Sequence, residues 1–506
     1  MSIAQFWLLA VWLTDNVSFR QPVGKVFGSM GQNIKGKLSA FCRNKTALVV
    51  TSLYALHVIG LLWTSDFAYA FKDLRVKLPL VVLPLIMSTM PAINKKQADT
   101  VLGVYVVAVF VATVLSFYKY VTASYSDIRQ ISSFISHIRF SLNILMCICI
   151  LLYCMANDKR LWLRLLSGAV ACWFLAQIYI MQVMSAYLIL VAVLVFAAFY
   201  AIFKSGMSKT LKLSLTGLAL LALVAVAAAV VHVAKPLFSV EKVDFATLPA
   251  TTAQGNSYRH DTVSSGVEDG RYIGLYYCED ELREAWDSRS DVAFDGLTLD
   301  GWPVKEVLAR YMTSKNLTKD AAGMAAMSDE DIVNVTNGVA NYNNFTYPGI
   351  RSRLSVMAFE LNNYRRTGNP NGGSVSQRLE YNKASLYLIG KHPVFGVGTG
   401  DIPNAYKQAY VELDSILDDQ YRYKAHNQYL SIMVGFGAIG LLVFLISLFC
   451  PCAMSKNKWN FLSISFFLII LLSMLPEDTI ETQAGATFFA FFNAFFLFAT
   501  PDDGFV

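Results

Sequence analysis

Apolar runs separated by short polar connections cover most of the chain. Most runs approach the roughly 20 residues that a helix needs to cross a bilayer core of about 30 Å. The pattern predicts about eleven or twelve transmembrane helices, and therefore an all-α polytopic membrane protein. The eleven predicted spans are 4–14, 47–64, 77–92, 99–118, 140–157, 161–180, 183–203, 212–236, 427–450, 459–475 and 484–500. The first run is short, but no small-residue cleavage site follows it, which favours a first helix over a signal peptide.

A polar stretch of 189 residues, 237–425, separates the eighth predicted span from the ninth. It is too long to be a plain loop. Within it, Leu354, Met357 and Leu361 fall at helical spacing, as expected for a helix with one buried face. We therefore predict three domains, which are N-terminal transmembrane helices at 1–236, a mainly helical domain at 237–425 and C-terminal transmembrane helices at 426–506.

The distribution of charge predicts the orientation in the membrane. The connection 15–46 and every second connection after it are rich in Lys and Arg, whereas 476–483 has three acids and no base. Basic connections stay on the cytoplasmic side, so the segment 237–425 is expected on the outer side of the membrane. That segment holds 25 acidic and 19 basic residues out of 36 and 42 in the whole chain. The resulting asymmetry reflects topology and does not indicate nucleic-acid binding.

The composition fits a membrane protein and shows no sign of a metal site. The chain is 55% hydrophobic and only 15% charged, against about a quarter charged in soluble proteins. Of the eight cysteines only Cys278 lies in 237–425, and no spacing matches a zinc site. The Asp-Glu-Asp run at 329–331 opens a helix-like stretch, where carboxylates favour the positive end of the helix dipole. The sequence predicts no metal and no cofactor.

The end of the polar stretch carries an arginine-containing helix followed by a glycine turn. Arg378 lies in a helix-like segment, and the turn after it places Gly396, Gly398 and Gly400 at alternate positions. Alternating glycines let a backbone approach another group closely and leave amides free to face an anion. The same pattern also fits a tight turn between two helices that needs no ligand. Spacing alone leaves both interpretations open.

His426 and Asn427 directly precede a long apolar run. On a continuous helix, Gly437 and Gly440 are eleven and fourteen residues after His426 and lie on roughly the same stripe. We expect these glycines to let a neighbouring helix pack closely beneath the histidine, whose ring would face the bundle at the water boundary. A solvated helix start is the alternative. The combination with Arg378 and the glycine turn on the outer face favours a site.

The motif His-Asn, nine residues, Gly, two residues, Gly at 426–440 resembles that of bacterial O-antigen ligases and the related O-antigen polymerases. The arginine-containing helix and the turn "HPVFGVG" at 392–398 resemble the same family. Further segments that match it in type are 73–88, 136–146 and 477–496. The resemblance covers most of the chain and is weakest over 240–350.

The resemblance implies a membrane glycosyltransferase of the GT-C type with a periplasmic active site. Such enzymes transfer a glycan from undecaprenyl pyrophosphate to an acceptor, which is lipid A–core for ligases and another lipid-linked repeat for polymerases. Arginine suits this chemistry because its planar fork holds phosphate oxygens, and histidine can take the proton of the acceptor hydroxyl. The family's metal independence agrees with neutralisation by arginine.

The resemblance also assigns roles to particular residues. His426 is the expected general base or acceptor-orienting group, and Arg378 is the expected catalytic and pyrophosphate-binding arginine. Arg139, at the outer end of a predicted span, is a second candidate clamp, although a snorkelling anchor would look the same. Arg353 is a further candidate for the pyrophosphate. The expected supporting residues are Asn427, Gly396, Gly398, Gly437 and Gly440.

An acidic group, Glu477, Asp478 and Glu481, follows a predicted span on the outer face. It either positions arginines or is solvated. One departure from the family is Ser185-Ala186, where members often carry Ser-Arg at the outer start of a helix. A clamp arginine is therefore missing or comes from Arg139, Arg351 or Arg353.

Several alternatives stay open at this point. An O-antigen polymerase or a protein glycan ligase would use the same pyrophosphate chemistry, and the Ala186 departure leaves room for an inactive scaffold. A transporter or flippase would place ionisable residues near the midplane and show two matching halves, features that this sequence lacks. The expected partners are the lipid-linked glycan donor, the lipid A–core or another glycan acceptor, and membrane lipids, with no nucleic acid.

Overall fold

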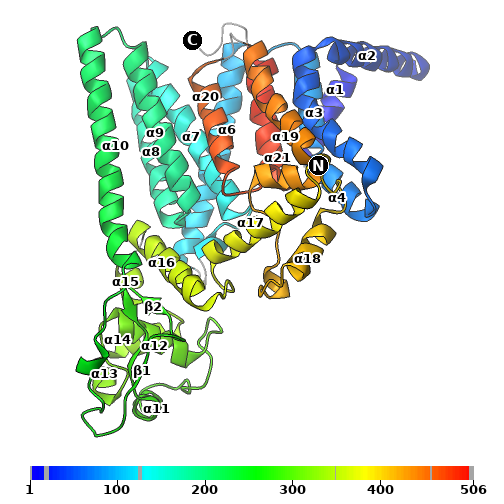
Figure 1. Ribbon diagram of the computed structural model, residues 1–506. Helices are drawn as coiled ribbons and strands as arrows, with labels where there is room; N and C mark the ends of the chain where they lie inside the picture. The colour runs from blue at the N-terminus through cyan, green and yellow to red at the C-terminus, as the bar shows by residue number, and fades with distance from the viewer. Residues whose placement is uncertain are drawn as a thin grey trace. The chain divides into compact units, whose positions relative to one another are not determined.

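The structure, a computed structural model, describes residues 3–15, 17, 22–122, 128–347, 349–455 and 459–500. The chain divides into two compact units (Figure 1). The first unit comprises Met1–Gly206, Tyr381–Ser415 and Arg422–Val506, and the second comprises Met207–Glu380 and Ile416–Tyr421. Hydropathy placed the boundaries at 236/237 and 425/426 instead. The difference arises because the helix after Met207 packs against a helix of the second unit, while residues 381–415 pack with the membrane helices of the first.

The first unit is built almost entirely from helices. Its α-helices are α1 (Ile3–Thr14), α2 (Val23–Arg43), α3 (Lys45–Ile59), α4 (Phe67–Lys77), α5 (Pro79–Thr89), α6 (Lys95–Thr122), α7 (His137–Asn157), α8 (Leu161–Met181), α9 (Met184–Lys204), the greater part of α17 (Ser374–Lys391), α18 (Ile402–Glu412), α19 (Gln428–Met454), α20 (Phe461–Ser473) and α21 (Gln483–Ala494). Short 3-10 turns lie at η1 (Gly60–Trp63), η2 (Ile128–Ile131) and η6 (Thr479–Glu481), and Phe495–Ala499 forms a π-turn.

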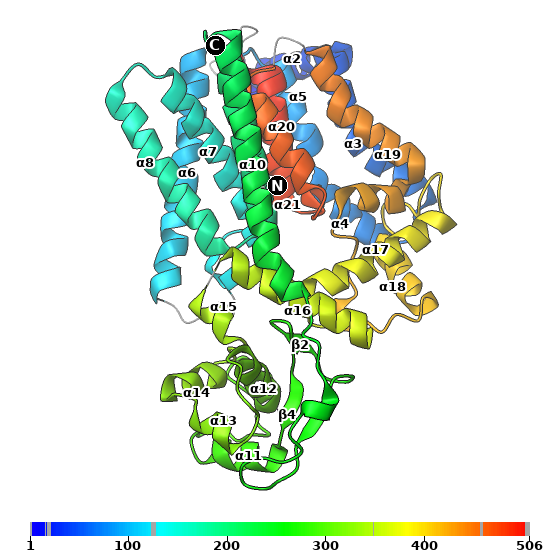
Figure 2. The ribbon, with the colours of Figure 1, turned by 60° about the vertical axis from the view of Figure 1, so that its left-hand side comes forward.

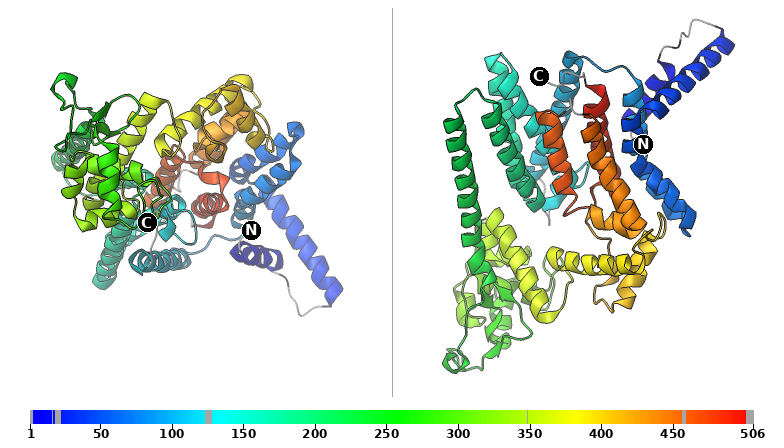
Figure 3. Two further views of the ribbon diagram at one scale, coloured as in Figure 1. Left: turned by 90° about the horizontal axis from the view of Figure 1, so that it is seen from below. Right: turned by 45° about the horizontal axis from the view of Figure 1, so that its top comes forward.

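The core of the first unit surrounds α7. This helix is apolar on all sides, and it is buried from Phe140 to Leu151 except for Asn143, as expected for a helix with no solvent- or lipid-facing stripe. Helices α6, α8, α9 and α20 pack against it. Figure 1 labels all five helices, and Figure 3 gives two further views of the chain. A second group pairs α3 with α19 and α5 with α21. The first turn of α7 carries Arg139. Helix α19 begins two residues after His426.

Seven helices within the described residues are long and apolar enough to cross a membrane. They span Lys45–Trp63, Lys95–Thr122, His137–Asn157, Leu161–Met181, Met184–Lys204, Lys209–Phe238 and Gln428–Met454. Three shorter apolar helices lie at Ala4–Thr14, Phe461–Ser473 and Gln483–Ala499. The predicted span 77–92 is only the 11-residue helix Pro79–Thr89, because the polar helix α4 ends just before it. The chain is therefore a mainly helical, multi-pass membrane protein.

The second unit combines one long apolar helix with a small globular body. Its core lies around Trp286, Phe294 and Tyr311, all fully buried, and Figure 2 shows α11–α14 gathered beside the strands. The four short strands form two antiparallel pairs, β1 with β4 and β2 with β3. Its helices are α10 (Lys209–Phe238), α11 (Glu279–Asp287), α12 (Val304–Ser314), α13 (Ala321–Ala325), α14 (Asp329–Thr336), α15 (Tyr342–Thr346) and α16 (Ile350–Thr367), and its strands are β1 (Arg259–Asp261), β2 (Val267–Glu268), β3 (Arg271–Tyr272) and β4 (Gly274–Tyr277). Residues 374–380 of α17 and the 3-10 turns η3 (Phe245–Thr247) and η4 (Asp419–Tyr421) also belong to it.

Candidate active site

His426 lies outside α19, in a left-handed backbone conformation. The helix begins at Gln428, and Asn427 caps it by accepting a hydrogen bond from the Leu430 amide at 3.1 Å. His426 has φ +47°, a region that non-glycine residues rarely occupy and that stores strain when neighbouring contacts enforce it. The Asn427 side chain donates to the Leu475 carbonyl at 2.8 Å, and the Gln428 amide donates to the Met474 carbonyl at 3.0 Å. The histidine is thus fixed by anchors that follow it directly.

The predicted stripe of glycines beneath His426 is wrong, because α19 does not run as one continuous helix. Gly437 has φ +64° and ψ −161°, which breaks the helix in its middle. The glycine turn enters this break. The amides of Val397 and Gly398 donate to the Val434 and Gly435 carbonyls at 2.9 Å each, and the Ala438 amide donates to the Pro393 carbonyl at 2.9 Å. The turn thereby satisfies backbone groups that a broken membrane helix would otherwise leave unpaired.

The close-approach interpretation of the glycine turn is confirmed. Gly396 and Gly398 have φ +68° and +91°, and a Cβ atom on Gly396 would overlap the backbone of Gly435 and Phe436. The amides of Val397 and Gly398 are used by α19 and therefore do not face an anion in this structure. Gly440 lies beyond the break, where α3 packs on α19 and Leu56 approaches it. The glycines serve packing of the scaffold under the site.

We expect Gly396→Ala to destabilise the purified protein by about 3 kcal/mol, because left-handed strain adds to a backbone overlap that cannot relax without opening the α19 break. Thermal unfolding in detergent measures this change. Gly390→Ala is the matched control, since Gly390 lies on α17 with no atom near its Cβ position and alanine favours a helix. Equal unfolding temperatures for the two variants would contradict the close-approach interpretation.

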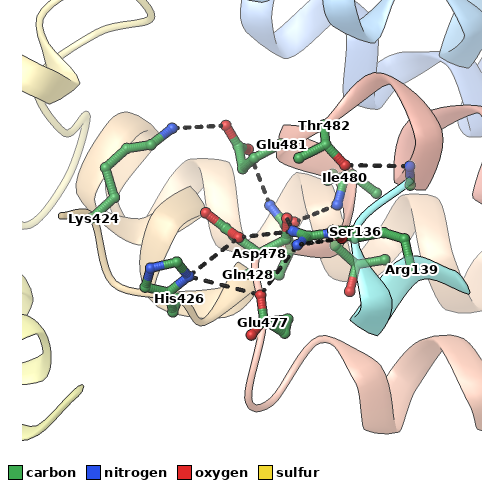
Figure 4. A network of polar contacts seen from close by, with 12 residues as sticks. Ser136, Arg139, Lys424, His426, Gln428, Glu477, Asp478, Ile480, Glu481 and Thr482 are labelled. Atoms are coloured by element: carbon green, nitrogen blue, oxygen red, sulfur yellow. Dashed lines mark hydrogen bonds and ion pairs between the residues drawn. The ribbon is translucent and has the colours of Figure 1, made fainter. Parts of the chain in front are cut away.

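Two buried carboxylates join His426 to Arg139 (Figure 4). Glu477 and Asp478 are only 3% and 7% exposed. The Arg139 guanidinium lies 3.4 Å from the Glu477 Oε2 and 3.2 Å from the Asp478 Oδ1. The His426 Nδ1 faces the same two oxygens at 3.7 and 3.8 Å. Of the two interpretations of the acidic group, positioning of cationic side chains therefore holds, and solvation does not.

The remaining surroundings of His426 are aromatic. The Tyr381 and Tyr423 rings lie 5.5 and 6.1 Å from the imidazole, measured between ring centroids. The His426 side chain is 33% exposed, whereas Glu477 behind it is buried. One edge of the ring therefore faces the acidic pair, and part of the ring stays accessible to a substrate. The Nδ1 distances exceed a hydrogen bond, as is common for catalytic contacts before substrate binds.

Glu481 is the centre of a second polar cluster, a hub that contacts residues before and after His426. Its Oε2 accepts from Lys77 at 2.9 Å and from Lys424 at 3.4 Å, while its Oε1 accepts from the Gln428 side chain at 3.2 Å. Lys77 also donates to Asp73, one turn earlier on α4, at 2.7 Å. Lys424 and Gln428 each lie two residues from His426. Glu481 therefore clamps the short segment that carries the histidine.

Burial and neighbouring charges set the electrostatics of this hub. Burial alone would raise the pKa of Glu481, but the ammonium groups of Lys77 and Lys424 hold that pKa well below its usual range. Burial alone would lower the pKa of Lys424, but the Glu481 carboxylate holds it above the ordinary value. For Asp478, burial raises the pKa although His426 opposes it. Glu481 and Lys424 are therefore charged at neutral pH, whereas Asp478 takes up a proton more readily than an ordinary aspartate.

Arg378 and Arg353 belong to the second unit. Arg378 lies on α17, whose predicted helical character is confirmed, and Arg353 lies on α16. Both side chains are half-buried, and the Arg353 Nε has no hydrogen-bond partner among the described residues. Arg351 lies over the Tyr347 ring, 5.2 Å from its centroid. The structure brings Arg139 to His426, while the roles of Arg378 and Arg353 in catalysis stay predictions.

Sequence reasoning missed Lys77, Asp73, Lys424 and Gln428. A signal was present, because Asp73 and Lys77 are four residues apart on one helix face directly before an apolar segment. An acid and a base spaced in this way, directly before an apolar segment, are candidates for a buried ion pair. The Ser185-Ala186 departure lies in the first turn of α9, where Ala186 is fully buried.

One group of described residues has the geometry to hold a metal ion. His426, Glu477 and Asp478 offer ligand atoms that lie within 4.8 Å of one another. The Arg139 guanidinium already forms ion pairs with both carboxylates here, and it would compete with a metal cation for them. The expectation that no metal is needed stays a prediction.

A family model matches the segment that carries His426. Residues 322–445 match the model described as O-antigen ligase, and this match includes the arginine-containing helix, the glycine turn and His426. The chain carries an O-antigen ligase domain. No curated protein matches the chain. The domain's family consists of membrane enzymes of O-antigen and lipopolysaccharide assembly, which supports an enzyme that acts on a lipid-linked glycan and an acceptor in a membrane.

Proposed function

We propose that this protein transfers a glycan from undecaprenyl pyrophosphate to lipid A–core on the periplasmic side of the bacterial inner membrane, without a metal. The observation that carries the proposal is the partly exposed imidazole of His426, backed by the buried carboxylates of Glu477 and Asp478. The family match at 322–445 supplies the reaction class. The same proposal includes that the protein is a glycosyltransferase of the GT-C type.

In the proposed step, the acceptor hydroxyl oxygen attacks the anomeric carbon of the glycan. The bond from that carbon to the pyrophosphate breaks, and the electron pair leaves with undecaprenyl pyrophosphate. His426 takes the hydroxyl proton. Because its Nδ1 faces the carboxylates, Nε2 is the nitrogen that would face the acceptor, as in other sites where a carboxylate orients a catalytic imidazole.

The charges around His426 suit proton uptake. Its cluster holds four carboxylates and three permanent cations, which leaves one negative charge for an imidazolium to balance. The members are Asp73, Glu477, Asp478 and Glu481 on the acidic side and Lys77, Arg139 and Lys424 on the basic side. The cluster is electrically neutral once the histidine is protonated. Fixed charges of this kind stabilise a transition state because they need no reorganisation.

The leaving pyrophosphate requires its own cations. Arg378 and Arg353 are the proposed clamps, since forked hydrogen bonds from guanidinium groups offset the charge that builds on the leaving oxygen. Arg139 would have to release a carboxylate to reach a phosphate. We therefore propose that Arg139 acts first through the acidic pair and contacts pyrophosphate only after such an exchange.

The test is deletion of the gene followed by gel analysis of cell-surface glycans. The proposal predicts lipid A–core without long glycan chains, restored by the wild-type gene. Single repeats left on the core would instead identify a polymerase, and loss of glycan from proteins would identify a protein glycan ligase. Unchanged surface glycans would contradict all three.

A further inference from the structure

A cleft of about 390 Å³ in the second unit contains a buried lysine that the proposed reaction does not use. The cleft lies among residues 241–248, β3, β4 and the segment 313–319. Lys319 in its wall is only 3% exposed. Its Nζ donates to the Leu275 carbonyl at 3.2 Å, and among the described residues it forms no ion pair with a carboxylate. An ammonium group has three donors, so a single carbonyl leaves most of its capacity unused.

A second positive charge lies beside this lysine. Arg271, on β3, also lines the cleft, and burial together with the charge of Arg271 lowers the pKa of Lys319 to about 8. Arg271 forms only a long ion pair, at 3.9 Å, with the exposed carboxylate of Glu241, which also lines the cleft. Burying a cation without a counter-charge, next to a like charge, is unfavourable. Such an arrangement is relieved when an anion enters.

We propose that this cleft binds an oxyanion, a phosphate or carboxylate group, between Lys319 and Arg271. Two sources share this chemistry, which are free phosphate and a charged group on the acceptor glycan. The second source rests on the proposed function, whereas the first does not. Oxyanions suit the pair because a guanidinium binds two oxygens at once and a lysine adds a point charge. The neighbouring Tyr272 and Tyr276 offer further polar and aromatic surface.

The experiment measures acetylation of individual lysines in the full-length protein in detergent, by mass spectrometry after brief treatment with an acetylating ester. Inorganic phosphate, phosphorylated core oligosaccharide and the same oligosaccharide after phosphatase treatment are compared with chloride at equal ionic strength. We expect a bound oxyanion to lower Lys319 acetylation at least about fivefold at saturation, because it covers the amine and keeps it charged. Lys305, exposed on α12, should not change.

Arg271→Met is the variant that tests the site, and it should abolish the protection of Lys319. Protection by phosphate alone supports an oxyanion site for the free ion, and protection by the phosphorylated oligosaccharide but not by its phosphatase-treated form places the anion on the glycan. If the reagent does not reach Lys319, thermal unfolding replaces it, and phosphate should stabilise the wild type but not Lys319→Met. No protection and no stabilisation would overturn the proposal while leaving the proposed glycan transfer intact.

Discussion

Replacement of His426 by asparagine is expected to lower the rate of glycan transfer about a thousandfold, the usual contribution of a general base. Asparagine tolerates the left-handed backbone at this position better than alanine does, so the fold should persist. The side chain can no longer accept a proton at neutral pH. The measurement is the initial rate of transfer by purified protein, supplied with the pyrophosphate-linked donor and lipid A–core in proteoliposomes.

His392→Ala is the matched control for this variant. His392 is exposed, lies at the end of α17 and has no carboxylate partner among the described residues, so its loss should leave the rate close to that of the wild type. The unfolding temperature of His426→Asn should also stay near the wild-type value. A rate within a factor of about three for His426→Asn would remove the histidine from the chemical step.

Glu481→Gln should produce the second large effect, on both stability and turnover. The substitution keeps the shape of the side chain but leaves Lys77 and Lys424 without their shared carboxylate, and breaking a buried ion pair in this way costs about 3–5 kcal/mol. Because the pKa of Glu481 is held below its ordinary 4.5, its contribution is fully present at neutral pH and is lost only as pH falls below that value. Thermal unfolding at pH 7 therefore reports the charged hub.

Turnover should fall in the same variant because the segment that carries His426 loosens. We expect kcat to drop about tenfold with little change in KM, since the histidine serves the transition state more than substrate binding. Glu412→Gln is the control, as Glu412 pairs with Lys391 at 2.7 Å on the exposed surface, where such pairs contribute little. If both variants unfold at the same temperature and keep wild-type kcat, Glu481 does not position the histidine.

Much of the helical framework could be predicted from hydropathy alone. Most predicted spans coincide with helices, because a run of about 20 apolar residues has few other stable states in a bilayer. The errors of this prediction are local. Hydropathy does not reveal the break in α19, because the residues on both sides of Gly437 are apolar. The break shows only in the backbone, where Gly437 has φ +64°. The stripe argument for Gly437 and Gly440 failed for this reason.

The site could be predicted only in part. His426 could be singled out by its motif and Arg139 by its place at the outer end of a predicted span, and the structure brings them to the same carboxylates. The burial of Glu477 and Asp478 was not predictable, because the sequence "PEDTIETQ" is typical of a solvated connection. Its burial depends on Arg139 of α7 and on His426, which precedes α19. Arg139 and Asp478 are 339 residues apart, and a contact at that separation leaves no periodic trace in one sequence.

The central claim is that this protein attaches a pyrophosphate-linked glycan to lipid A–core by chemistry centred on His426, without a metal. The most direct measurement is mass spectrometry of both products from wild-type protein in proteoliposomes containing EDTA. The account predicts one undecaprenyl pyrophosphate released for each glycan joined to lipid A–core, and neither product from His426→Asn. Glycan transfer that stops in EDTA, or that continues with His426→Asn, would contradict it.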